Sequence, residues 1–176
     1  MHAMTRFLTA VLLFLTLAFA QADNIRVVAW NLEWFPGKRQ NAAPEQQARH
    51  MKAAQEALIQ LKPDILIVVE VRDWAAVEEL VSVVPSLKVN VVSHFNLPQN
   101  QAIASRFVAD SAWSEDWKRN GPGAPPRGYV FAALQLPDGR LLLTYALHLK
   151  SNRDGIAPNI PKREEWGGPR FRTSRS

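Results

Sequence analysis

The chain has 176 residues, of which 47% are hydrophobic, a composition typical of a globular protein and not of a disordered one. It carries 21 Lys and Arg against 16 Asp and Glu, and this net charge of +5 suits a polyanionic partner such as nucleic acid without requiring one. It contains no cysteine, which excludes disulfide bonds, thiolate metal sites and a thiol nucleophile.

The first 22 residues have the layout of a secretory signal peptide. Arg6 supplies the basic start, and the apolar run from Phe7 to Phe19 is short for a membrane span. Two small-x-small cleavage patterns follow, ending at Ala20 and Ala22. We therefore expect a secreted or periplasmic protein with no stable membrane insertion after signal cleavage. An uncleaved anchor helix is the alternative.

Residues Ile25–Phe35 predict the first strand, because the residues up to Trp30 are nearly all β-branched, aromatic or small. Such a run is typical of a strand buried between two layers. Asn31 interrupts it, and a buried amide costs free energy unless it has hydrogen-bond partners. Capping a turn is the commonest role of an asparagine at a strand end.

A helix is predicted from Pro44, where apolar residues recur at spacings of three and four until Lys62-Pro63-Asp64 ends it. The apolar run Ile65–Val69 then predicts a second strand, which ends in Glu70. A strand–helix–strand order implies parallel strands. Asn31 and Glu70 should therefore meet at one edge of the sheet, the edge where open α/β sheets bind ligands.

The remaining chain predicts one more helix and four more strands. Asp73 can cap the helix, whose inner residues are expected to be Trp74, Val77, Leu80, Val81 and Val84. The segment Ala109–Arg119 gives no clear assignment. The expected strands are Leu87–Ser93, Gln101–Ser105, Arg127–Leu136 and Leu141–Leu147, the last two joined by a turn at Pro137–Gly139.

Three apolar strands thus close on one polar residue each: Asn31, Glu70 and His148. Each has an ordinary structural alternative: a turn cap for Asn31, a salt bridge with Arg72 or Arg127 for Glu70, and a structural imidazole for His148. Together they favour a site. Glutamate and asparagine offer oxygen ligands to Mg²⁺, Mn²⁺ or Ca²⁺, and histidine offers a proton or a hydrogen bond to an anionic substrate. A zinc site is disfavoured, since there are no cysteines and no His pair at ligand spacing.

Four segments, in this order, resemble successive motifs of the endonuclease/exonuclease/phosphatase superfamily, the fold of deoxyribonuclease I and exonuclease III. The likeness extends from about Ile25 to Glu165. The segments are residues 28–34 (VAWNLEW), 62–70 (KPDILIVVE), 101–106 (QAIASR) and 147–151 (LHLKS).

The resemblance implies a four-layer α/β sandwich of two mixed β-sheets flanked by helices, and metal-dependent hydrolysis of phosphoesters. It implies that Glu70 is the metal-binding carboxylate and that Asn31 is the amide beside the metal. His148 would contact the phosphate and assist departure of the leaving group. Arg127, which opens a predicted strand, is a further candidate for holding phosphate, with a structural salt bridge as its alternative.

The sequence also departs from the family pattern. The family continues with a Gly-Asp-x-Asn segment and ends with an Asp-His pair whose histidine activates the attacking water, and neither is present here. Residues 161–165 resemble the start of a helix, but 166–176 form an irregular basic tail, as in a truncated or frameshifted product. A genuine polyanion-binding tail is the alternative. We expect a signal peptide at 1–22, a partial domain at 23–165 with one sheet incomplete, and an impaired enzyme.

Two functions follow as hypotheses. The first is an exported, monomeric, divalent-metal-dependent nuclease or phosphodiesterase using Mg²⁺, Mn²⁺ or Ca²⁺. The second is a non-catalytic exported module that holds polyanions with its basic surface and with Trp113 and Trp117. DNA, RNA, phospholipid and small phosphate esters all remain open as substrates, because one fold supports many specificities.

Overall fold

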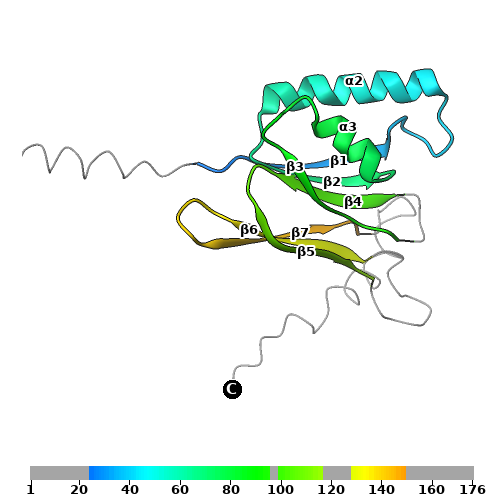
Figure 1. Ribbon diagram of the computed structural model, residues 1–176. Coiled ribbons are helices and arrows are strands. Elements are labelled where there is room, and N and C mark those ends of the chain that lie inside the picture. The colour runs from blue at the N-terminus through cyan, green and yellow to red at the C-terminus, as the bar shows by residue number, and fades with distance from the viewer. Residues whose placement is uncertain (1–23, 96–98, 117–127, 150–176) are drawn as a thin grey trace, which may run out of the picture.

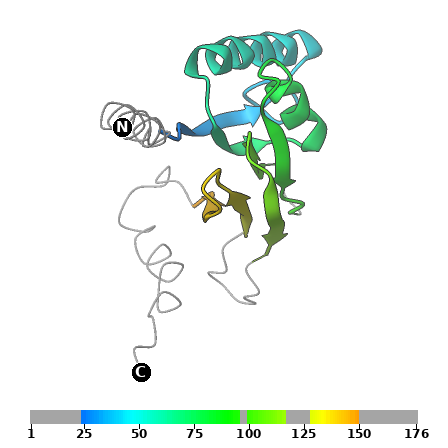
Figure 2. The same ribbon diagram turned by 60° about the vertical axis from the view of Figure 1, so that its left-hand side comes forward.

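The computed structural model describes residues 24–95, 99–116 and 128–149. Within these ranges the chain forms two β-sheets packed face to face, and two helices cover the outer face of one sheet (Figure 1). The turned view in Figure 2 shows the same order of layers. No helix in the described ranges combines the length and the hydrophobicity needed to cross a membrane.

The first sheet, sheet A, is mixed and has the strand order β1-β2-β4-β3. Strands β1 (Val27–Phe35) and β2 (Ile65–Val71) are parallel, and the crossover between them is helix α2 (Pro44–Leu61). The predicted strand–helix–strand unit is therefore confirmed. Strand β4 (Asn100–Ser105) pairs antiparallel with both β2 and β3 (Lys88–Val92).

The second sheet, sheet B, has the order β5-β6-β7, with antiparallel pairing throughout the described strands. Strands β6 (Tyr129–Gln135) and β7 (Leu141–Leu147) form the predicted hairpin, in which Gly139 takes φ +82° and its N–H donates to the carbonyl of Leu136. Strand β5 (Ala109–Glu115) lies in the segment for which no element was predicted. Its polar and small residues carry a weak strand pattern, so pairing with β6 decides its conformation.

Two apolar layers hold these elements together. The layer between sheet A and the helices contains Met51, Ala54 and Leu58 of α2 beside the β2 residues Leu66 and Val68. The layer between the sheets contains Ile65 of β2 and Ile103 of β4 from sheet A, and Val130 and Leu134 of β6 from sheet B. Strand β2 is thus buried on both faces, as its continuous apolar run predicts.

Strand β1 differs from the prediction that both of its faces are buried. Strand β7 packs against β2 and β4, and the face of β1 on this side remains open. Val27 is 51% exposed, and Ala29 and Asn31 are exposed as well. An apolar strand pattern thus gave the conformation correctly, but which faces are covered depends on how far the second sheet extends.

The α/β fold class is confirmed, with differences in detail from the four-layer expectation. Sheet A is mixed, but the described strands of sheet B are all antiparallel. Three layers lie within the described ranges. The outer face of sheet B carries a row of exposed apolar side chains on β7, in agreement with the expected uncovered face: Leu141, Leu143, Tyr145 and Leu147.

Helix α3 (Trp74–Val81) follows β2 directly and buries Val77, Leu80 and Val81 as predicted. Trp74 is 38% exposed, contrary to prediction, because it is the first residue of the helix and lies at its open end. The predicted cap is confirmed, since the Asp73 carboxylate accepts a hydrogen bond of 2.8 Å from the N–H of Ala76.

Replacing Asp73 with alanine is expected to lower the free energy of unfolding by about 1 kcal/mol, the usual value of such a cap. Burial alone would raise the pKa of Asp73, but the hydrogen bond from Ala76 and the guanidinium of Arg72 outweigh it and lower the pKa. The stabilisation is therefore present above the unfolded-state pKa near 4 and is lost as the pH falls through the lower folded-state pKa. Urea unfolding of both proteins at pH 7 and pH 2.5 measures this, and an equal difference at the two pH values would contradict it.

Candidate active site

The three residues predicted to form a site come together in the structure. The Asn31 side-chain amide donates a hydrogen bond of 3.0 Å to Oε1 of Glu70, and Nε2 of His148 lies 3.2 Å from the same oxygen. Asn31 and Glu70 belong to sheet A, and His148 directly follows β7 of sheet B. The side chains of His148 and Glu70 are 13% and 14% exposed, so this cluster lies at one end of the interface between the sheets, partly open to solvent.

An irregular backbone at this edge presents the side chains. Residue Asn31 pairs with Val69 and Phe35 pairs with Val71, so three residues of β1 lie opposite Glu70 alone. Glu33, Trp34 and Glu70 all have φ between 52° and 63°. Left-handed conformations cost roughly 1–2 kcal/mol in non-glycine residues, and such strain gathers at functional sites. The bulges re-aim Glu70 out of the sheet at the position of the cluster.

Four donors fix the Glu70 carboxylate. Besides the two groups at Oε1, the backbone N–H of Trp34 donates to Oε2 at 3.2 Å and the Gln99 side chain donates to it at 2.8 Å. A carboxylate offers about four lone-pair sites, so all of them are in use. A ligand that binds Glu70 must therefore displace one of these donors. Displacement is easiest at Oε1, because both of its partners are side chains that can rotate away.

The side chain of Asn31 makes both the turn contact expected of a structural asparagine and a contact with Glu70. Its Oδ1 accepts a hydrogen bond of 2.9 Å from the N–H of Glu33, which is the local turn contact typical of asparagine. Its amide nitrogen faces Glu70 at the same time. One side chain thus stabilises the left-handed turn and orients the carboxylate.

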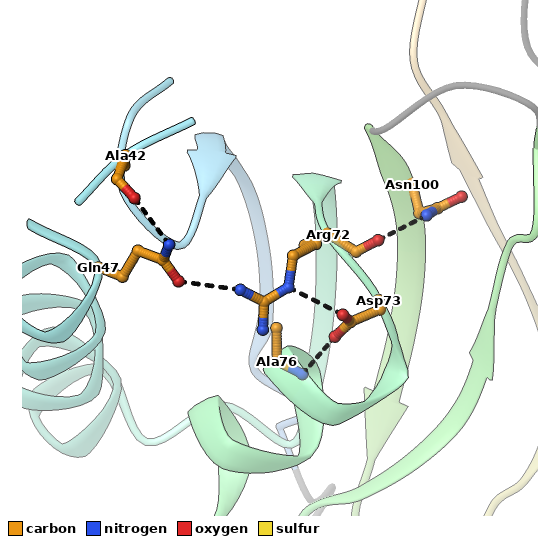
Figure 3. A network of polar contacts seen from close by, with 6 residues as sticks. All are labelled: Ala42, Gln47, Arg72, Asp73, Ala76 and Asn100. Carbon is orange, nitrogen blue, oxygen red and sulfur yellow. Dashed lines mark hydrogen bonds and ion pairs between the residues drawn. The ribbon is translucent and has the colours of Figure 1, made fainter. Parts of the chain in front are cut away.

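A second network holds the strand end behind Glu70 (Figure 3). The Arg72 guanidinium donates to Asp73 at 2.8 Å and to Gln47 of α2 at 2.9 Å. The backbone of Arg72 donates to the carbonyl of Phe35 at 2.8 Å and accepts from the Asn100 side chain at 2.8 Å. Strands β1, β2 and β4 are therefore tied together immediately after the bulge.

This network bears on the alternative that Glu70 forms a structural salt bridge with Arg72. The side chain of Arg72 pairs with Asp73, so the structure does not support an Arg72–Glu70 salt bridge. The other partner considered, Arg127, lies outside the described residues, and its role as a phosphate ligand stays a prediction.

Sequence reasoning missed two of the four donors to Glu70. The Trp34 contact uses a backbone N–H, which carries no side-chain signal, and Gln99 precedes its strand without any motif. A third polar group, Gln101, is fully buried between the sheets, where its amide donates to the Gly128 carbonyl at 3.1 Å and its Oε1 has no hydrogen-bond partner among the described residues. A run of Gln99, Asn100 and Gln101 just before an apolar strand was the available signal.

The donor set fits a hard cation that keeps most of its water. Glu70 supplies the carboxylate, whereas Asn31 turns its amide nitrogen toward Glu70 and its Oδ1 toward the N–H of Glu33. The described residues contain no cluster of three or more His, Asp or Glu able to hold a metal. Mg²⁺ commonly binds through one or two carboxylates together with water and substrate phosphate, whereas Ca²⁺ takes six to eight oxygen ligands. The residues present therefore suit Mg²⁺ or Mn²⁺ better than Ca²⁺.

Comparison with known proteins gives structural matches only, as no protein-family model and no curated protein matches the sequence. A truncated TDP2 from Caenorhabditis elegans matches with a TM-score of 0.59 and 21% identity over 81% of this chain. An endonuclease/exonuclease/phosphatase from Beutenbergia cavernae gives 0.57 and 16% over 80%. A mannosyl-6-phosphatase from Bacteroides thetaiotaomicron gives 0.54 and 16% over 84%.

These matches confirm at the level of fold the resemblance read from the motifs. The chain spans 53%, 42% and 62% of the lengths of the three matched chains. At identities below 25% the likeness concerns the fold, and the chemistry must be argued from the residues at the site.

Proposed function

We propose that this chain, which has the fold of the endonuclease/exonuclease/phosphatase superfamily, carries part of the active site of an exported, divalent-metal-dependent phosphoester hydrolase. A nuclease or phosphodiesterase is the leading form of the proposal, with extracellular nucleic acid as the substrate. Support for export comes from the signal-like residues 1–22, and support for a polyanionic substrate from the net charge of +5.

The observation that carries the proposal is the convergence of Asn31, Glu70 and His148. They come from three separate strands and from both sheets, yet two of them contact one oxygen of the third. A purely structural ion pair would not require left-handed residues on both adjoining strands. The likeness in fold to phosphoester-processing proteins supports the same assignment.

Each residue has a definite task in this proposal. Glu70 would hold the cation, with Asn31 orienting the carboxylate. The bound cation would neutralise phosphate oxygens and act as a Lewis acid. His148 in its protonated form would turn the N–H that now faces Glu70 to the phosphate and give that proton to the leaving oxygen, which leaves a neutral imidazole.

The proposal includes impaired activity for this 176-residue chain. The Asp-His pair whose histidine activates the attacking water in the family pattern is not found in this sequence. General base catalysis is worth about 10²–10⁴ in rate, so we expect hydrolysis to be slow.

The test is a hydrolysis assay of the full chain with DNA, RNA and bis(p-nitrophenyl) phosphate in Mg²⁺ or Mn²⁺. We expect slow turnover of at least one substrate, loss of it in EDTA, and a further loss of about tenfold or more in Glu70→Gln, which removes the charge but not the volume. Hydrolysis that Glu70→Gln leaves unchanged would contradict the proposed site. Fast turnover abolished by Glu70→Ala would support the site but contradict the impairment.

The described residues give little support to the alternative function, a module that binds polyanions by aromatic stacking. Trp113 is 44% exposed, but its ring packs against Phe131 with centroids 4.1 Å apart. Trp117 lies outside the described residues. Polyanion binding unaffected by EDTA and by Glu70→Gln would favour this alternative over the enzyme.

A further inference from the structure

A pocket of about 430 Å³ lies between the loop Pro36–Ala43 and the first turns of helix α2. Its lining contains none of Asn31, Glu70 and His148, and the loop that lines it follows strand β1 and leads into helix α2 (Figure 1). Its volume falls in the range of small-molecule sites. The lining residues are Gly37, Lys38, Arg39, Gln46, Arg49, His50 and Ala53.

The lining is strongly cationic. Lys38, Arg39 and Arg49 carry three positive charges, and no Asp or Glu belongs to the lining. Within the described part of the chain, Lys38 and Arg49 form no salt bridge, and Arg39 donates to the neutral Oε1 of Gln46 at 2.7 Å. The three residues are exposed, so water and salt weaken their mutual repulsion, and an anion in the pocket would relieve the part that remains.

His50 adds a neutral donor of fixed orientation. Its Nδ1 accepts a hydrogen bond of 2.9 Å from the N–H of Gly37, so the neutral ring carries its hydrogen on Nε2. Burial and then the charge of Lys38 lower the pKa of His50, against a weaker opposing effect of Glu33. The imidazole is therefore uncharged at neutral pH and offers one N–H to an occupant.

The backbone and an aromatic contact hold this geometry in place. Gly37 has φ +119°, a conformation that suits glycine, and it packs against Ala42 across the loop. The ring of His50 meets the ring of Phe35 edge-on, with centroids 5.1 Å apart. The side-chain oxygen of Gln46 accepts hydrogen bonds from the Ala43 N–H and from Arg39. The contact with Ala43 orients the Gln46 side chain, which in turn holds the Arg39 guanidinium.

We propose that this pocket binds a phosphate group. Three cations and one N–H match the negative charge and the several acceptor oxygens of phosphate. The planar guanidinium of arginine can donate two parallel hydrogen bonds to two phosphate oxygens. The volume exceeds what a bare phosphate needs, so the pocket has room for the rest of a nucleic-acid strand or of a small phosphate ester. The site uses neither Glu70 nor a cation, and it therefore stands apart from the proposed hydrolysis.

The experiment titrates the full chain with inorganic phosphate in EDTA and follows the histidine ring nitrogens by NMR. We expect the Nε2 signal of His50 to move while that of His94 stays in place. Arg49→Ala is expected to weaken phosphate binding about tenfold, the value of one charge-assisted hydrogen bond. Lys52→Ala, which removes the same charge from the same helix outside the pocket, should change the affinity less than about twofold.

Two further arms define the source of the phosphate and separate this proposal from the catalytic one. A single-stranded oligonucleotide that displaces phosphate from His50 assigns the site to nucleic acid, and a sugar phosphate that alone displaces it assigns the site to a small ester. The Glu70→Gln variant should bind phosphate at His50 as tightly as the unmodified chain does. This result is expected whether or not Glu70→Gln lowers the rate of hydrolysis, so the two proposals can fail separately. An unmoved His50 signal, or equal losses in Arg49→Ala and Lys52→Ala, would overturn the proposal.

Discussion

Glu70→Ala is expected to weaken the binding of Mn²⁺ to the folded chain by at least about tenfold, since loss of a mere supporting group at a metal site already costs about 10–100-fold. Glu70 is the carboxylate on which Asn31 and His148 converge, so its removal takes away the charged ligand of the proposed site. Isothermal titration with Mn²⁺, at a pH where the chain is folded, measures the affinity directly.

The matched variants make this result specific. Glu78→Ala removes an exposed carboxylate from helix α3 and should leave the affinity unchanged. His148→Ala should not weaken Mn²⁺ binding and is expected to strengthen it, because it frees a lone pair on Oε1 of Glu70. Equal affinities for the unmodified chain and Glu70→Ala would remove the cation from the proposed function.

Leu58→Ala is expected to lower the free energy of unfolding by about 2–5 kcal/mol, the range for deleting a buried leucine side chain. Leu58 is 0% exposed and lies in the apolar layer that joins α2 to sheet A. The effect is a large share of the stability of a domain of this size, which is about 5–15 kcal/mol. Urea unfolding followed by circular dichroism gives the difference.

Ile59→Ala is the control, because Ile59 is the next residue of the same helix and is 48% exposed. It should cost less than about 1 kcal/mol. Similar losses at the two positions would mean that α2 does not cover sheet A as the structure shows. Since Gln47 of the same helix holds Arg72 behind Glu70, Leu58→Ala should also loosen the site, and the Mn²⁺ titration detects this.

The arrangement of the site explains why it needs both sheets. Sheet A alone supplies Asn31, Glu70, the Trp34 N–H and Gln99, which together place one carboxylate. His148 arrives from sheet B, so the position of the proposed proton donor depends on how the two sheets pack. The proposed phosphate pocket is lined by the loop after β1 and by helix α2, and it should therefore tolerate changes in sheet B that disturb the proposed catalytic edge.

The sequence by itself determined the elements with strong periodicity. Helix α2 and strand β2 were predicted from their apolar spacing, and Glu70 and Asn31 from the polar residues that interrupt apolar runs. His148 followed from the same pattern on β7. The elements and the meeting of these side chains were predicted correctly because burial acts locally: a buried strand must be apolar along its length, and a polar residue at its end then indicates a purpose. The functional roles of the three residues stay a prediction.

Only the tertiary structure decided the rest. Strand β5 carries too few apolar residues to be recognised and exists through its pairing with β6. The face of β1 is open because sheet B stops at β7 in the described strands, and no feature of residues 27–31 encodes that. The contacts of Trp34 and Gln99 with Glu70, and the grouping of Lys38 with Arg49 and His50, join residues whose closeness depends on bulges and loop closure. Such contacts arise from the packing of whole elements, whereas periodicity reports only the environment of each residue.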